Sequence, residues 1–210
     1  MLGLLGKKIG MTTIFSEDGR KVPVTVISAG PCHVVQIKTA EKDGYSALQL
    51  GYDPIKHKHS NKPMMGHFKK AGLPPFRKVR EFTLDDTESE FKIGQELKIA
   101  DIFDEGEIID CIGTSKGKGF QGGVKLHHFK GGPKTHGQSD RNRAPGSIGA
   151  SSYPSRVVKG LRMAAHMGSD TVTVKGLEIV KILTDDNLVL IKGSIAGPKG
   201  GYVILRRSIK

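Results

Sequence analysis

A glycine-rich segment in the middle of the chain carries the pattern closest to a ligand-binding motif. Gly117-Lys-Gly-Phe-Gln-Gly122 matches the G-x-G-x-x-G pattern of dinucleotide-binding turns, and with Val124 it also matches the glycine-rich loop of kinases. A dinucleotide site needs a helix at the third glycine and an acid about 20 residues further on, but Asn142 stands near that place. The other kinase motifs are absent from the sequence. We therefore expect no nucleotide site, no cofactor and no enzymatic activity.

Histidines of the same region could in principle serve as metal ligands or general bases: His127, His128, His136 and His166. Between residues 111 and 168 the only acid is Asp140, so no carboxylate lies close in sequence to orient a catalytic histidine. The one Cys-His pair, Cys32-His33, has no partners at zinc-ligand spacing. We expect no catalytic residue and no metal, and we expect these histidines to make polar contacts with RNA.

The segment is suited to a polyanion. Its glycines let the main chain approach a phosphate, and its lysines and arginines neutralise the charge. No sustained period of 2 or 3.6 runs through residues 115–155, so the segment cannot bury a core of its own. Flexible linkers are rich in Gly and Ser, whereas this segment interleaves Lys, Arg, His and aromatic residues. The segment is therefore predicted to be an arm that becomes ordered when it binds a polyanion. The alternative is a flexible linker without a binding role.

The composition of the whole chain agrees with such a partner. The 33 Lys and Arg against 21 Asp and Glu give a formal charge of +12, which favours nucleic acid or an anionic membrane surface. No stretch approaches the ~20 apolar residues of a membrane span, and the start is too short for a signal peptide. We expect a soluble, cytoplasmic protein without a membrane or small-molecule partner. Cys32 and Cys111 lie in apolar runs, which predicts buried thiols rather than a disulfide.

The elements that must position the arm are mostly β. Short runs rich in Val, Ile and Thr alternate with turn signals such as Asp18-Gly19 and Asp43-Gly44, which predicts antiparallel strands. Many short strands with little helix favour a closed or nearly closed barrel, because closure removes exposed sheet edges. The expected strands cover residues 8–15, 21–28, 33–39, 45–52, 76–82, 95–99, 107–113, 171–183, 188–192 and 202–206.

Three segments depart from the strand pattern. Residues 53–75 predict an inserted loop with a short helix over 63–71. Residues 160–168 predict a short helical turn with Met163 and Met167 four residues apart, for packing or for a ligand. Residues 81–110 hold eleven acids against Lys92 and Lys98, a charge excess for which the sequence offers no account.

Four motifs follow one another along the chain: MLGLLGKKIGMTTIF at residues 1–15, GTSKGKGFQG at 113–122, APGSIG at 144–149 and KGLRMAAHMG at 159–168. In order and spacing they resemble the bacterial-type large-subunit ribosomal protein L3 (uL3) family, and the likeness covers essentially the whole chain. The insertion at 63–72 is also similar. Two positions depart from the family pattern: Ala150 stands where a glutamine is often methylated, so we expect no modification there, and Asn142 replaces a common histidine.

The resemblance implies a translation-protein-type antiparallel β-barrel formed by residues 1–114 and 166–210, with residues 115–165 as the glycine-rich basic arm. It implies a structural role in the large (50S) subunit, with binding of 23S rRNA near its 3′ end, early assembly, and an arm that reaches toward the peptidyl-transferase region. It also implies neighbouring proteins such as L14 and L19. A free RNA-binding translation factor or assembly factor with a similar barrel is the alternative function.

We expect the arm's RNA contacts to come from its cations, two glycines, two histidines and one aromatic ring: Lys116, Gly117, Lys118, Gly119, Phe120, Lys125, His127, His128, Lys130, Lys134, Arg141, Arg143, Arg156, Lys159 and Arg162. Phe129 and Tyr153 are further candidates for stacking on bases, with packing on protein as the alternative. Further basic candidates on the barrel are Lys7, Lys8, Arg206, Arg207 and Lys210.

Overall fold

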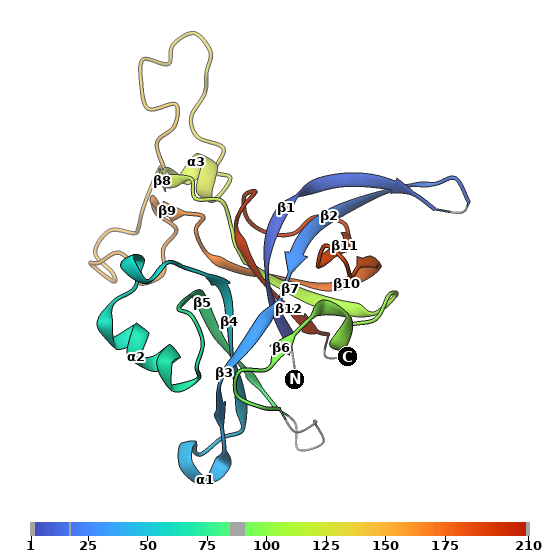
Figure 1. Cartoon of the computed structure of the whole chain (residues 1–210). Helices are drawn as coiled ribbons and strands as arrows, with labels where there is room; N and C mark the ends of the chain where they lie inside the picture. Colours follow the sequence, from blue (N-terminus) through green and yellow to red (C-terminus); the bar gives the residue numbers. More distant parts are fainter. Residues whose placement is uncertain (1–2, 17, 85–90, 209–210) are drawn as a thin grey trace. The chain divides into compact units, whose positions relative to one another are not determined.

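A computed structural model describes residues 3–16, 18–84 and 91–208 (Figure 1). The chain divides into two compact units, residues 1–114 with 171–210 and residues 115–170. The second boundary falls after Asp170 rather than after residue 165, because residues 165–167 form a strand that pairs within the 115–170 unit.

Six antiparallel strands close into a barrel in the order β1-β12-β7-β10-β11-β2. Their bounds are β1 Gly3–Phe15, β2 Lys21–Ala29, β7 Ile108–Thr114, β10 Thr171–Leu183, β11 Leu188–Lys192 and β12 Tyr202–Arg207. The first and last strands of the chain lie side by side, with Leu4 opposite Leu205. The expected β-rich fold with a closed antiparallel barrel is confirmed.

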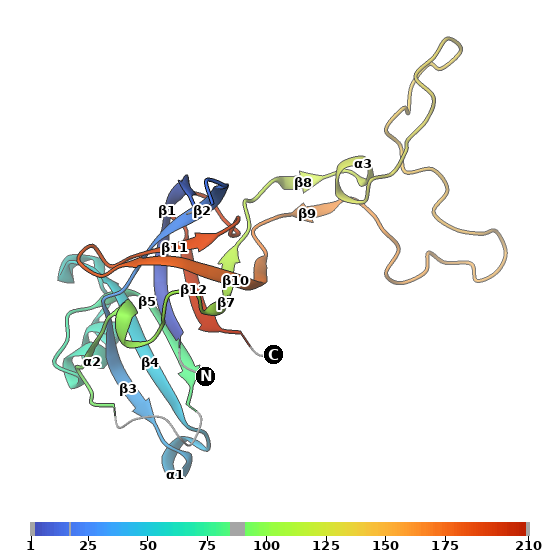
Figure 2. The same cartoon turned by 90° about the vertical axis from the view of Figure 1, so that its right-hand side faces the viewer.

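The remaining strands of this unit form a separate four-stranded sheet in the order β5-β4-β3-β6 (Figure 2). Their bounds are β3 Cys32–Lys38, β4 Ala47–Pro54, β5 Phe76–Thr83 and β6 Glu96–Leu97. The sequence left the number of barrel strands open, and these four strands lie outside the six-stranded barrel. The chain turns at Gly30, whose φ of 80° suits glycine, and β3 then pairs with β4 and β6 instead of returning to the barrel.

One hydrophobic core joins the barrel and this sheet. Leu4, Ile179 and Leu205 from the barrel and Leu48 and Leu50 from the sheet belong to the same cluster of buried side chains. Each is fully shielded from solvent, and burying a side chain of this size contributes about 1.5–3 kcal/mol. The cluster therefore holds barrel and sheet together as one unit.

The inserted segment folds as the sequence predicts, with a short helix. The helix α2 (Lys62–Lys70) has Pro63 in its first turn, where proline is tolerated. Phe68 is its one buried residue, and it packs edge-on against Phe76 of β5. The other short helices of this unit are α1 (Ala40–Asp43), η1 (His57–His59) and η2 (Ile99–Asp101).

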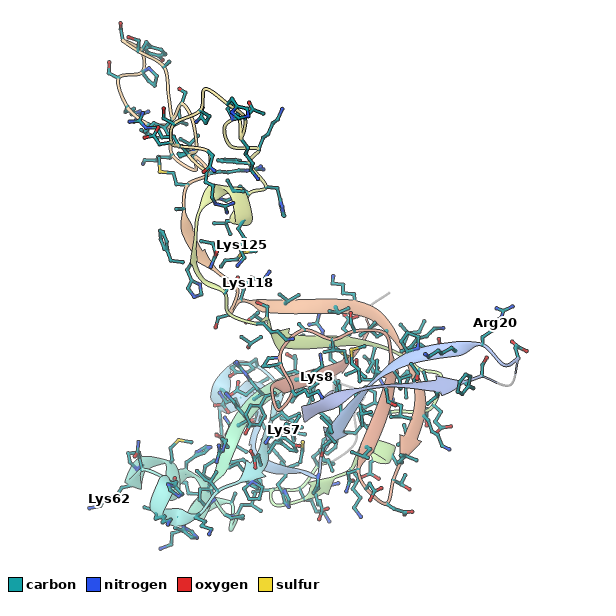
Figure 3. The ribbon with its side chains drawn as sticks, turned by 90° about the horizontal axis from the view of Figure 1, so that it is seen from above. Lys7, Lys8, Arg20, Lys62, Lys118 and Lys125 are labelled. Atoms are coloured by element: carbon teal, nitrogen blue, oxygen red, sulfur yellow. The ribbon has the colours of Figure 1, made fainter. Side chains whose placement is uncertain are left out.

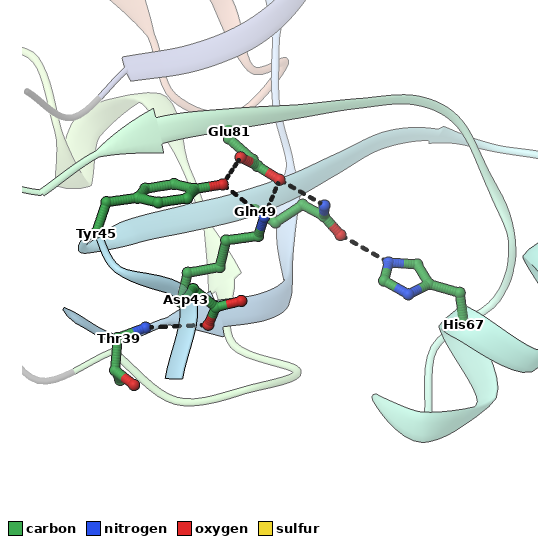
Figure 4. A network of polar contacts seen from close by, with 7 residues as sticks. Thr39, Asp43, Tyr45, Gln49, His67 and Glu81 are labelled. Atoms are coloured by element: carbon green, nitrogen blue, oxygen red, sulfur yellow. Dashed lines mark hydrogen bonds and ion pairs between the residues drawn. The ribbon is translucent and has the colours of Figure 1, made fainter. Parts of the chain in front are cut away.

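A polar network on the α2 side of the sheet is centred on Glu81 (Figure 4). Its carboxylate forms an ion pair of 3.0 Å with Lys38 and accepts hydrogen bonds from Tyr45 and Gln49. The Gln49 oxygen lies 2.6 Å from His67 Nε2 of α2. The hydrogen bonds from Lys38 and Tyr45 lower the pKa of Glu81, and the same contacts with Tyr45 and Glu81 raise the pKa of Lys38.

The structure gives the acidic stretch a role in the fold. Asp101 accepts a hydrogen bond from the Lys98 amide at the start of η2. Glu105 accepts one from the Ile182 amide. Asp110, 2% exposed, accepts one from the Gly176 amide at a bulge in β10. These carboxylates satisfy backbone groups at turns and bulges. Four acids of the stretch lie outside the described residues: Asp85, Asp86, Glu88 and Glu90.

Both cysteines are buried and free, as predicted. Burial raises the pKa of each thiol to about 12, and the Cys32 thiol donates a hydrogen bond to the Leu5 carbonyl. These thiols act as small apolar core residues.

Candidate nucleic-acid interface

The 115–170 unit begins and ends in a short antiparallel ladder. The strand β8 (Gly119–Gln121) pairs with β9 (Ala165–Met167), and Phe120 stands opposite His166 (Figure 2). The Ser115 amide donates to the Asp170 carbonyl at 2.8 Å, which extends the pairing to the ends of the unit. The predicted helical turn at residues 160–168 is wrong, because residues 165–167 are extended and paired with β8.

A single helical turn, α3 (Gly123–Leu126), follows β8 directly after Gly122. The glycine pattern at residues 117–122 thus ends where a helix begins, but this helix is only four residues long. A dinucleotide site requires a full helix behind the turn. The local structure therefore agrees with the rejection of a nucleotide site.

Residues 127–164 contain no helix or strand. A few contacts fix their course: the Gly132 amide donates to the Asn142 carbonyl at 2.9 Å, and His127 Nε2 lies 2.9 Å from the Met163 carbonyl oxygen. All residues from 115 to 170 are described, and none of them is buried. This unit has no core of its own.

The charge of the chain is concentrated in this unit. The unit contains ten Lys and Arg and two Asp, so its net charge is +8, out of +12 for the whole chain. Every one of these ten side chains is exposed: Lys116, Lys118, Lys125, Lys130, Lys134, Arg141, Arg143, Arg156, Lys159 and Arg162. Lys118 and Lys125 are labelled beside β8 and in α3 (Figure 3). Arg141 alone among them forms an ion pair with a described residue, at 3.9 Å from the highly exposed Asp140.

The aromatic side chains of the unit differ in their surroundings. Phe120 is 73% exposed and Tyr153 is 88% exposed. Phe129 is half-buried, lies against Gly123 and has its ring 5.6 Å from that of His127. Phe120 and Tyr153 thus present open ring faces, whereas Phe129 packs on protein. Gly117, Gly119 and His128 are also exposed.

The basic candidates on the barrel are mostly engaged within the fold. Lys8, only 8% exposed, donates to the carbonyl oxygens of Ile195 and Gly197 at 2.6 and 3.3 Å. Arg206 pairs with Asp110 at 3.5 Å and Arg207 with Glu107 at 2.9 Å.

Lys7 is exposed, and its ammonium lies 5.8 Å from the centre of the Tyr202 ring (Figure 3). Lys210 lies outside the described residues. Lys78 and Arg80, two of the three exposed cations on β5, were not among the basic candidates taken from the sequence. Their alternation along a predicted strand was the signal that could have found them.

Comparisons with known proteins agree with one another. The family model described as Ribosomal protein L3 matches residues 81–188, which is just over half of the chain. The "Large ribosomal subunit protein uL3" of Chloroherpeton thalassium is 52% identical over 203 residues, and these cover 97% of both chains. The protein of the same description from Pelotomaculum thermopropionicum is 53% identical over 208 residues, which cover 99% of this chain and 97% of that one.

The chain belongs to the ribosomal protein L3 family. This L3-family protein is a structural, non-enzymatic component of the large ribosomal subunit. It binds large-subunit rRNA, associates with other ribosomal proteins and takes part in translation, as follows from the family. No helix in residues 3–16, 18–84 and 91–208 is long and apolar enough to span a membrane.

Proposed function

We propose that this protein binds 23S rRNA near its 3′ end, supports early assembly of the large subunit and stays bound to the ribosome in the cytoplasm. Residues 115–165 act as the arm that enters the rRNA and reaches toward the peptidyl-transferase region. L14 and L19 are the neighbouring proteins. Family membership favours this role over a free translation or assembly factor.

The distribution of charge and burial carries the proposal. The 115–170 unit has a net charge of +8, exposed cations and no buried residue, so it lacks the means to order itself by a core. A polyanion can supply the missing contacts, because each cation that meets a phosphate releases a condensed counterion. The open rings of Phe120 and Tyr153 can stack on unpaired bases.

A salt titration of RNA binding tests the arm. In one full-length variant, four lysines of the arm are replaced by glutamine: Lys116, Lys118, Lys125 and Lys130. A matched variant removes the same charge from exposed lysines of the other unit: Lys42, Lys56, Lys58 and Lys62. Binding to a 23S rRNA 3′-domain fragment is measured from low to high salt.

If the arm engages phosphates, its variant should flatten the slope of log affinity against log salt by about 2.8–3.6. The matched variant should leave the slope near that of the wild type. Equal slopes in all three proteins would contradict an RNA-binding role of the arm. A high-salt wash of large subunits distinguishes a structural component from a free translation or assembly factor. A factor that cycles on and off would be released, whereas a structural component would stay bound.

A further inference from the structure

A groove runs between β5 of the four-stranded sheet and strands β12 and β7 of the barrel. It consists of two neighbouring cavities of about 460 and 90 Å³, and Arg80, Ile112 and Ile204 line both of them. All of the lining residues belong to the unit made of 1–114 and 171–210. The larger cavity falls in the size range of small-ligand sites, ~300–1,000 Å³.

One wall of the groove is the side of β5. Four consecutive residues, 80–83, line the larger cavity. Neighbouring residues of a strand point to opposite faces, so such a run reaches the cavity along the strand's edge. In the strand order, β5 is the outermost strand of its sheet. The groove therefore follows the length of a strand and suits an extended ligand.

The cations of β5 that line the groove come from one face of the strand. Lys78 stands opposite Tyr52, and Arg80 stands opposite Leu50. Tyr52 and Leu50 belong to the core shared with the barrel, so this face of β5 is turned toward the barrel. Residues two apart along a strand are separated by roughly 6.7 Å, which is comparable with the spacing of successive phosphates along an RNA strand.

Further positive charge gathers around Tyr202. The ammonium groups of Lys78 and Lys7 lie 5.1 and 5.8 Å from the centre of its ring. Burial and the hydrogen bond to Asp53 raise the pKa of Tyr202 to about 12, so this phenol stays neutral. Arg206 lines the opposite wall of the larger cavity.

Among the described residues, the acids near the groove have other partners; residues 85–90, which follow the cavity-lining Thr83 closely in sequence, lie outside that part of the chain. Asp53 accepts a hydrogen bond from Tyr202 and pairs with Arg77 at 3.6 Å. Asp110 accepts a hydrogen bond from the Gly176 amide and pairs with Arg206. Glu81, which itself lines the larger cavity, pairs with Lys38 at 3.0 Å. Within the described residues, Arg80 forms no ion pair. Lys78 and Arg80 thus give the groove a cationic wall on the β5 side, while Ile112 and Ile204 give it apolar surface.

We propose that this groove is a second RNA site, which takes a single-stranded phosphodiester segment of rRNA. Lys78 and Arg80 contact successive phosphates, since a guanidinium can bind a phosphate through two hydrogen bonds. The apolar surface receives a sugar or the face of a base. The inference rests on the RNA-binding role of the protein, but it uses a different unit of the chain from the arm.

A charge-matched pair of full-length variants tests the groove. Lys78→Gln/Arg80→Gln removes the two groove cations, and Lys69→Gln/Lys70→Gln removes two exposed lysines of α2. The groove variant should flatten the salt slope of binding to large-subunit rRNA by about 1.4–1.8 and weaken binding roughly tenfold at 0.15 M salt. The α2 variant should bind like the wild type. The exchange Lys78→Arg/Arg80→Lys keeps both charges and should retain the slope.

Three outcomes would overturn the proposal. One is an unchanged slope in the groove variant while its melting temperature matches the wild type. Another is an equal loss in the groove and α2 variants, which would indicate a general charge effect. The third is unchanged RNA binding with reduced incorporation into large subunits, which would identify an acidic protein segment as the occupant. If only the arm variant has a flatter salt slope, the proposed function stands and the groove is not an RNA site.

If only the groove variant has a flatter salt slope, the groove is supported and RNA binding by the arm is contradicted.

Discussion

Neighbouring residues of β12 provide a test of the barrel's register. Leu205 is fully buried in the core, whereas Ile204 is half-buried and lines the groove on the outside. Leu→Ala at a fully buried site costs about 2.7–5 kcal/mol, because the lost transfer energy adds to that of the cavity left behind. We expect Leu205→Ala to lower the free energy of unfolding by about 3–4 kcal/mol. Ile204→Ala should cost about 1 kcal/mol, since much of its surface already meets solvent.

Thermal unfolding followed by circular dichroism measures the difference. For a unit of about 150 residues, 1 kcal/mol shifts the melting temperature by about 2–4 °C, so Leu205→Ala should lower it by about 10 °C and Ile204→Ala by about 3 °C. A shift of β12 by one residue would exchange the inward and outward faces. If Ile204→Ala proved the more destabilising change, the register of Leu205 opposite Leu4 and Cys111 would be refuted.

Three further predictions follow from local contacts. Because the ion pair with Lys38 lowers the pKa of Glu81, its stabilisation is present above the unfolded-state pKa and is lost as the pH falls through the folded-state value. Glu81→Gln should therefore remove part of the loss of stability between about pH 5 and 3, by less than about 1 kcal/mol, in denaturant titrations at each pH. Cys32 and Cys111 should resist alkylation at pH 8 in the native protein and react in 6 M guanidinium, which mass spectrometry would show. Gly168→Ala should loosen the β8–β9 ladder, since its φ of 78° is strained for alanine and a Cβ would meet backbone atoms; faster amide exchange at residues 118–121 is the readout, and unchanged exchange would contradict it.

The positions of the strands could be predicted from the sequence far better than their pairing. The alternation of apolar residues at 22–26 identifies β2. It does not indicate that β2 pairs with β11 or that β3 belongs to a different sheet. Pairing depends on contacts between distant parts of the chain, which local patterns do not contain. The helical turn expected at residues 160–168 failed for the same reason, because pairing with β8 outweighs a weak local preference.

The residues of the candidate interface could likewise be predicted only in part from the sequence. Composition located the basic segment, since charge and the lack of a periodic apolar pattern are visible in the sequence itself. It could not separate Lys7 from Lys8, because only the fold shows that Lys8 is buried and donates to the carbonyl oxygens of Ile195 and Gly197. It also did not select Lys78 and Arg80, which only the fold brings beside residues of the barrel in one groove.

The paired residues Thr114 and Thr171 mark where the 115–170 unit leaves the barrel and returns to it. Opposite residues of an antiparallel pair lie about 4.5–5.5 Å apart, so the excursion starts and ends at almost one point. The entropy of closing such a loop grows only logarithmically, and a doubling of its length costs about 0.6 kcal/mol more. Insertions and deletions in the loop thus place little thermodynamic burden on the barrel. The stability of the barrel therefore constrains the length and sequence of the loop only weakly.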